Sequence, residues 1–141
     1  MIRLRSVIIV GLVLWVGIAT AGNAGTGNVD PTILPRFEQV QRLAQQMVEH
    51  GRHGHTAEIV QYANEMIRQM EQLVAAVGAL DAVVPPKKRQ AMLQAVLRLA
   101  MGDATAAARL GEAHDPRAAM AAARRAAFQI KRARAAWEAA Q

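Results

Sequence analysis

The apolar residues between Ile59 and Leu80 recur at alternating spacings of four and three, the most regular pattern in the chain. That spacing places them on one face of an α-helix, which has 3.6 residues per turn. Pro85 and Pro86 end this helix by about Val84, because neither proline has an amide hydrogen to donate. A helix with one apolar face must cover that face by packing. The face comprises Ile59, Ala63, Met66, Met70, Leu73, Val77 and Leu80.

Another helix is expected before this one. Asp30 and Pro31 suit a helix start, since Asp caps free N–H groups and proline is tolerated in the first turn. The apolar face stops at His50–Gly51, where glycine can take the left-handed conformation that closes a helix. Thr56 then opens the second helix. The face of the first helix comprises Phe37, Val40, Ala44 and Met47.

Two helices are expected after the prolines. Lys87 begins a segment whose apolar phase continues across Gly102, which favours one long helix over two shorter ones that break there. The sequence His114-Asp115-Pro116 places a capping residue before a proline and so starts the last helix. The apolar face of this helix comprises Met120, Ala123, Ala127, Ile130 and Trp137.

Four helices joined by short turns predict an all-α fold, an up-down-up-down four-helix bundle. In that topology the turn between helices one and two lies at the same end as the turn between helices three and four. Alanine dominates the composition and only 4% of residues are aromatic, which favours closely packed helices.

The N-terminus has the order of a signal peptide. Arg3 and Arg5 precede an apolar run over 7–18, and Ala19-Thr20-Ala21 supplies a small-x-small cleavage site. We therefore expect a signal-peptide helix at 1–21, a flexible segment at 22–30 and a single helical-bundle domain at 31–141. The protein would be periplasmic or otherwise secreted. The alternative is an uncleaved anchor, in which case the membrane becomes a partner.

Composition excludes several functions. There is no cysteine, so the chain has neither disulfides nor thiolate ligands. The only serine is Ser6, and no phosphate-binding loop is present, so we do not expect an enzyme. Cleavage after Ala21 removes two of 17 basic residues and none of 11 acidic ones, which leaves a net charge of +4. The last helix is basic but has no interleaved aromatics to stack on bases, so nucleic acid is not an expected partner. The oligomeric state stays open.

Three of the four histidines fall within six residues, at His50, His53 and His55. Neutral imidazole is a common ligand for divalent copper, zinc and nickel. His114 and Asp115 lie at the other turn of the same bundle end, so they are further candidate ligands. The alternative is that these histidines do no more than solvate an exposed turn.

The segment from Val48 to Glu71 resembles the repeat of the small metal-binding proteins, whose turn has the form His-Gly-x-x-Gly-His. The matching residues are His50, Gly51, Gly54, His55 and Ala63. The resemblance implies an exported four-helix protein that binds copper and other divalent ions. Where that pattern has histidines on the helix, this chain has Tyr62 and Gln69, so it would be a divergent, histidine-poor member.

Two functional hypotheses follow. The first is an exported metal-binding or metal-buffering protein that uses the histidine-rich turn, with copper as the first candidate ion and nickel or zinc as others. The second is a helical extracytoplasmic interaction protein, or a chaperone-like one, that acts without metal.

Overall fold

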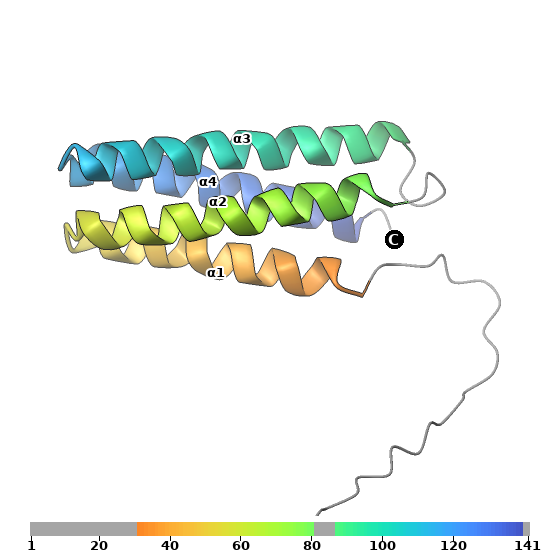
Figure 1. The fold of residues 1–141 in the computed structure, drawn as a ribbon, viewed down its shortest axis with the longest axis horizontal. Coiled ribbons are helices and arrows are strands. Elements are labelled where there is room, and N and C mark those ends of the chain that lie inside the picture. The colour runs from red at the N-terminus through yellow and green to blue at the C-terminus, as the bar shows by residue number, and fades with distance from the viewer. Residues whose placement is uncertain (1–30, 81–86, 140–141) are drawn as a thin grey trace, which may run out of the picture.

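The computed structural model describes residues 31–80 and 87–139, and these form four helices packed side by side (Figure 1). The helices are α1 (Ile33–Arg52), α2 (Thr56–Gly78), α3 (Lys87–Glu112) and α4 (Pro116–Glu138). Consecutive helices run in opposite directions, as expected for an up-down-up-down bundle. The α1–α2 turn and the α3–α4 turn lie at the same end, on the left of Figure 1. The all-α prediction is confirmed for this part of the chain.

The bundle is closed by contact between α1 and α4, while α2 packs on α3 and each helix also packs on its partner in the hairpin. Only apolar side chains and glycine are buried among the described residues, so burial of apolar surface stabilises the fold without buried ion pairs. None of the described helices has both the length and the apolarity that a bilayer span requires. The largest fully buried side chains are Phe37, Ile33, Met47, Ile59, Met66, Met70, Leu73, Leu97 and Ile130.

Several predicted boundaries need correction. Helix α1 continues through Gly51 to Arg52, and the glycine with a left-handed backbone is Gly54, whose φ is 72°. Helix α2 ends at Gly78, within the predicted limit of about Val84, so that Leu80 of its predicted apolar face lies just beyond the helix. Helix α3 is continuous through Gly102, as predicted. The proposed signal peptide, the segment at 22–30 and the proline pair lie outside the described residues.

The buried face of α4 was also predicted one residue out of phase at two positions. Met120 and Ala127 are only half-buried, whereas Ala119, Ala126 and Ala133 are fully buried. Because α4 has alanine on several sides, hydrophobicity alone does not mark which alanine faces the core.

The two hairpins repeat each other with an offset of sixty residues. Each buried residue of α1 and α2 has a buried counterpart sixty positions later, from Ile33 and Leu93 through to Val77 and Trp137. The turns match as well, since Gly54 and His114 are the two described residues with positive φ. The bundle is therefore a structural tandem of one helical hairpin, although few residues are identical between the halves.

Two equivalent glycines bring the hairpins together at the turn end. A Cβ on Gly51 of α1 would lie 2.8 Å from Cβ of Met120 on α4. A Cβ on Gly111 of α3 would lie 2.8 Å from Cγ2 of Val60 and 3.0 Å from the carbonyl oxygen of Thr56, both on α2. Only a residue without a side chain permits these approaches, so both positions require glycine.

We expect Gly111→Ala to lower the free energy of unfolding by about 1–3 kcal/mol, because the backbone of Thr56 and the stiff side chain of Val60 must move. Gly102→Ala is the matched control, since nothing lies within 4 Å of its Cβ position. It should stabilise the protein by about 0.5–1 kcal/mol through helix propensity. Urea unfolding followed by circular dichroism measures both. Equal effects would contradict the close approach at Gly111.

Candidate metal centre

The turn between α1 and α2 is fixed by two backbone hydrogen bonds. The N–H of His55 donates to the carbonyl of His50 at 3.0 Å, and the N–H of Gly54 donates to the carbonyl of Gly51 at 3.2 Å. This pair of bonds, with a left-handed glycine between them, is a Schellman ending. It folds the chain back on itself, so that the last turn of α1 and the first residue before α2 become neighbours.

His50 and His55 meet across this turn. Their Nδ1 atoms lie 3.4 Å apart, and their ring centroids are separated by 5.7 Å. A carboxylate oxygen of Glu58, in the first turn of α2, completes a group in which all three ligand atoms lie within 4.8 Å of one another. His50 and Glu58 are half-buried and His55 is exposed. The group therefore offers two imidazole nitrogens and one carboxylate oxygen to an ion that can enter from solvent.

Tyr62 supports this group from α2. Its ring stacks on His50 with centroids 5.2 Å apart and an interplanar angle of 27°. Tyr62 follows Glu58 by one helical turn, so both side chains face the end of α1. The stacking restricts the orientation of the His50 ring and thereby helps to hold its Nδ1 towards His55.

His53 is not part of the three-residue group. Its Nε2 lies 3.3 Å from a carboxylate oxygen of Glu49, and its ring centroid is 5.8 Å from that of His55. Arg52 donates to the other oxygen of Glu49 at 2.8 Å. The hydrogen bond with His53 and the charge of Arg52 lower the pKa of Glu49 below its ordinary range. Glu49 is therefore already paired, which makes it a weaker candidate ligand than Glu58.

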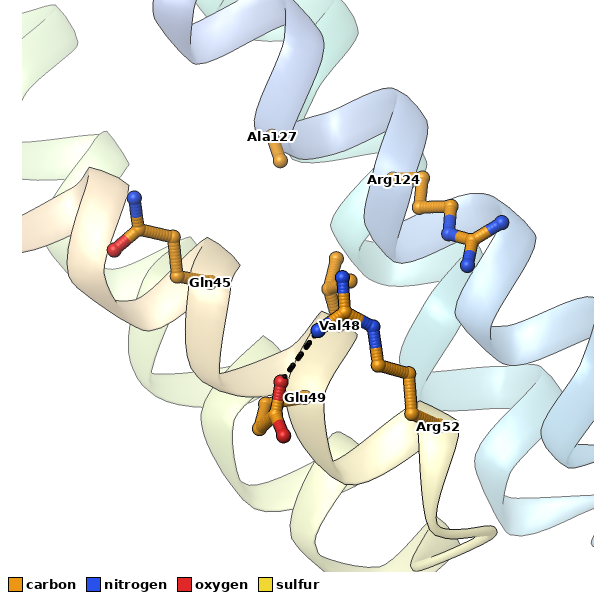
Figure 2. A pocket seen from close by; sticks show the side chains of 6 residues that line it. All are labelled: Gln45, Val48, Glu49, Arg52, Arg124 and Ala127. Carbon is orange, nitrogen blue, oxygen red and sulfur yellow. Dashed lines mark hydrogen bonds and ion pairs between the residues drawn. The ribbon is translucent and has the colours of Figure 1, made fainter.

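A groove of about 450 Å³ opens between α1 and α4 (Figure 2). The ion pair between Arg52 and Glu49 forms part of its lining. Arg52 reaches back along α1 to Glu49, and Arg124 extends from α4. No histidine lines the groove, so it is separate from the candidate metal centre. Its lining consists of Gln45, Val48, Glu49, Arg52, Arg124 and Ala127.

The turn between α3 and α4 places His114 and Asp115 in other roles. His114 takes the left-handed position with φ of 54°, which histidine adopts more readily than most residues. Asp115 caps α4, since its carboxylate accepts the N–H of Ala118 at 2.9 Å. Neither residue belongs to the group of close ligand atoms found among the described residues.

The repeat explains why the second turn carries no comparable group. The positions equivalent to His50, His55 and Glu58 are Leu110, Asp115 and Ala118. The backbone bonds are the same, because the N–H of Asp115 donates to the carbonyl of Leu110 at 3.0 Å. The two turns thus share one backbone and differ in the side chains that could ligate an ion.

Sequence reasoning overlooked two residues of the site. Glu58 was not among the predicted ligands, although it follows His55 by three positions and so lies on the same side of the helix start. Tyr62 was noted as a departure from a family pattern, and its stacking on His50 depends on how the two helices pack.

No protein-family model, curated protein or solved structure matches this chain. The case for a metal therefore rests on the geometry of the first turn and on the residues that form it.

Proposed function

We propose that this protein binds a divalent transition-metal ion through His50, His55 and Glu58. The observation that carries the proposal is the 3.4 Å separation of the two Nδ1 atoms. Two nitrogens bound tetrahedrally at about 2.0–2.1 Å from one ion are about 3.3–3.4 Å apart. The imidazoles are therefore already spaced for shared coordination, and the Glu58 carboxylate needs only a side-chain adjustment to join them.

Three protein ligands leave room for water or an exchangeable ligand in the coordination sphere. His55 is exposed, so an ion can enter and leave without opening the bundle. These features support metal buffering or transfer better than a closed structural site. Copper is the first candidate by affinity, because cupric ions bind nitrogen and oxygen sites more tightly than nickel or zinc. The tetrahedral spacing itself favours zinc, because cupric ions prefer square-planar or tetragonal sites.

We also propose that the protein is exported and that residues 1–21 are removed. Expression of the full chain in a bacterial host should then yield a product whose intact mass corresponds to a start at or near Gly22. Retention of the full-length mass in the membrane fraction would support an anchor instead.

We predict that His50→Ala and His55→Ala each lower the affinity for cupric ions by more than about 100-fold. Loss of a residue that only hydrogen-bonds to a metal ligand lowers affinity by roughly 10- to 100-fold, and loss of a ligand itself should have a larger effect. Calorimetric titration of the purified protein at pH 7.5 measures this. Binding should also weaken at pH 5.5, because protons compete for imidazole nitrogens whose ordinary pKa is about 6.5. A hundredfold excess of ion over its dissociation constant should raise the melting temperature by roughly 10 °C.

His114→Ala is the matched control, since this histidine lies in the equivalent turn at the same end of the bundle but outside the ligand group. It should bind as the parent does. If cupric, nickel and zinc ions leave the melting temperature unchanged, the metal proposal fails and the interaction-protein hypothesis takes its place. Equal loss in all three histidine variants would mean that the ion is held elsewhere.

The repeat allows a constructive test. Leu110→His, Asp115→His and Ala118→Glu together place the same ligand set on the second turn. We expect this triple variant to bind two ions per chain where the parent binds one. Its free energy of unfolding should be lower by about 1 kcal/mol, because the helix cap of Asp115 is lost. When the three substitutions are combined with His50→Ala and His55→Ala, the protein should again bind one ion per chain. A folded triple variant that binds no additional ion would show that these three side chains are insufficient.

A further inference from the structure

The two hairpins carry very different charges. Helices α1 and α2 together have four arginines and five glutamates, whereas α3 and α4 have eleven basic and three acidic residues. The net charges are therefore −1 and +8. Since the hairpins lie side by side, one flank of the bundle is strongly cationic and the other is nearly neutral.

Phe128 lies among the basic residues of α4. Its side chain is 60% exposed, although a large apolar side chain is normally buried. Arg124 and Arg125 precede it by one helical turn, and Lys131 and Arg132 follow it by one turn, so four basic residues surround it. The guanidinium of Arg132 lies 5.8 Å from the ring centroid.

Apolar side chains of α3 extend this surface. The ion pair between Arg125 and Asp103, at 2.9 Å, shows that these two residues lie at the same level of the two antiparallel helices. Leu99 lies one turn before Asp103, and Phe128 lies one turn after Arg125, so both occur at the same level of the bundle. Leu99 is 59% exposed, and Met92, two turns earlier on the same side of α3, is 53% exposed. We call Met92, Leu99, Phe128 and its four basic neighbours the basic apolar face.

The repeat shows that the fold does not require this face. The position equivalent to Phe128 in the first hairpin is Arg68, which pairs with Glu65. Leu99 corresponds to Gln39. The four basic neighbours correspond to Asn64, Glu65, Glu71 and Gln72. The same backbone thus tolerates a polar surface with two acidic residues, and the basic apolar face needs another explanation.

We propose that the basic apolar face docks the bundle onto an anionic lipid surface. Basic residues would contact lipid phosphates while Phe128, Leu99 and Met92 enter the boundary between headgroups and acyl chains. Arg124 and Lys131 have no ion-pair partner among the described residues, so they are free to bind anions. Nucleic acid fits less well, because single strands are bound by several stacking aromatics and this face has one.

The proposed lipid contact does not depend on the metal site. The sequence predicted the membrane as a partner only if the N-terminal segment is retained, whereas the basic apolar face would bind lipid without that segment. The full chain has an apolar stretch at 7–18, so binding must be compared between two kinds of vesicle. We would measure cosedimentation with neutral phosphatidylcholine vesicles and with vesicles in which part of the phosphatidylcholine is replaced by anionic phosphatidylglycerol. The readout is the ratio of the two partition coefficients.

The double variant Lys131→Gln, Arg132→Gln should lower this ratio roughly 10- to 30-fold, because each basic residue near an anionic surface contributes about fivefold. Its matched control, Arg42→Gln with Arg68→Gln, removes the same charge from the first hairpin and should leave the ratio within about twofold. Phe128→Ala should lower binding to anionic vesicles about fivefold. Leu34→Ala, which removes an exposed apolar side chain of α1, should not.

Circular dichroism checks that each variant is folded, as expected for exposed positions. Equal losses in the two charge variants would overturn the proposal, because net charge alone would then explain the binding. A ratio of one for the parent would overturn it as well. Fluorescence anisotropy with a single-stranded oligonucleotide completes the test. Binding there that depends on Phe128 and Arg132, without a preference for anionic vesicles, would replace the lipid proposal with a nucleic-acid one.

Discussion

The close approach of the hairpins at Gly51 and Gly111 determines how tightly the bundle packs at the end that carries both turns. At each glycine, a side chain of the other hairpin occupies the space that a Cβ would fill. The two contacts are reciprocal, since Gly51 meets Met120 and Gly111 meets Val60, and these pairs are related by the sixty-residue offset. They pack the hairpins closely beside the two turns, which the up-down topology already places at one end of the bundle. The α1–α2 turn, which carries His50 and His55, therefore lies beside a closely packed part of the bundle.

The repeat separates what the backbone determines from what the side chains add. Both turns close with the same two backbone hydrogen bonds and a left-handed residue. Only the first turn carries two imidazoles and a carboxylate within reach of one ion. Only the second hairpin carries an exposed phenylalanine among basic residues. The two hairpins thus share one backbone and one pattern of buried positions, while their surface residues differ.

Much of this could be predicted from the sequence, because the apolar spacing and the turn residues are local signals. The four helices, their up-down order, and the nearness of His50 and His55 all follow from such signals. The interior position of Gly51 could not be predicted, since it depends on Met120 of another helix. The end of α2 at Gly78 agrees with the prediction of an end by about Val84, but the prolines set only a latest possible end and not the exact residue. Tyr62 joins the site only once α1 and α2 are packed, whereas Glu58 could have been found from its spacing of three residues after His55.

The proposed metal site and the basic apolar face lie on different parts of the bundle, and they would bind their ligands through different interactions. Attraction between basic side chains and lipid phosphates is screened by salt over about 8 Å at physiological ionic strength. Coordination by imidazole responds instead to protons. Because the ligand turn belongs to the hairpin with net charge −1, a bundle docked through α3 and α4 would keep His55 open to solvent. A metal ion would also meet less repulsion there than beside α4. The uneven charge of the hairpins therefore allows one small bundle to hold a cation and face an anionic surface at once.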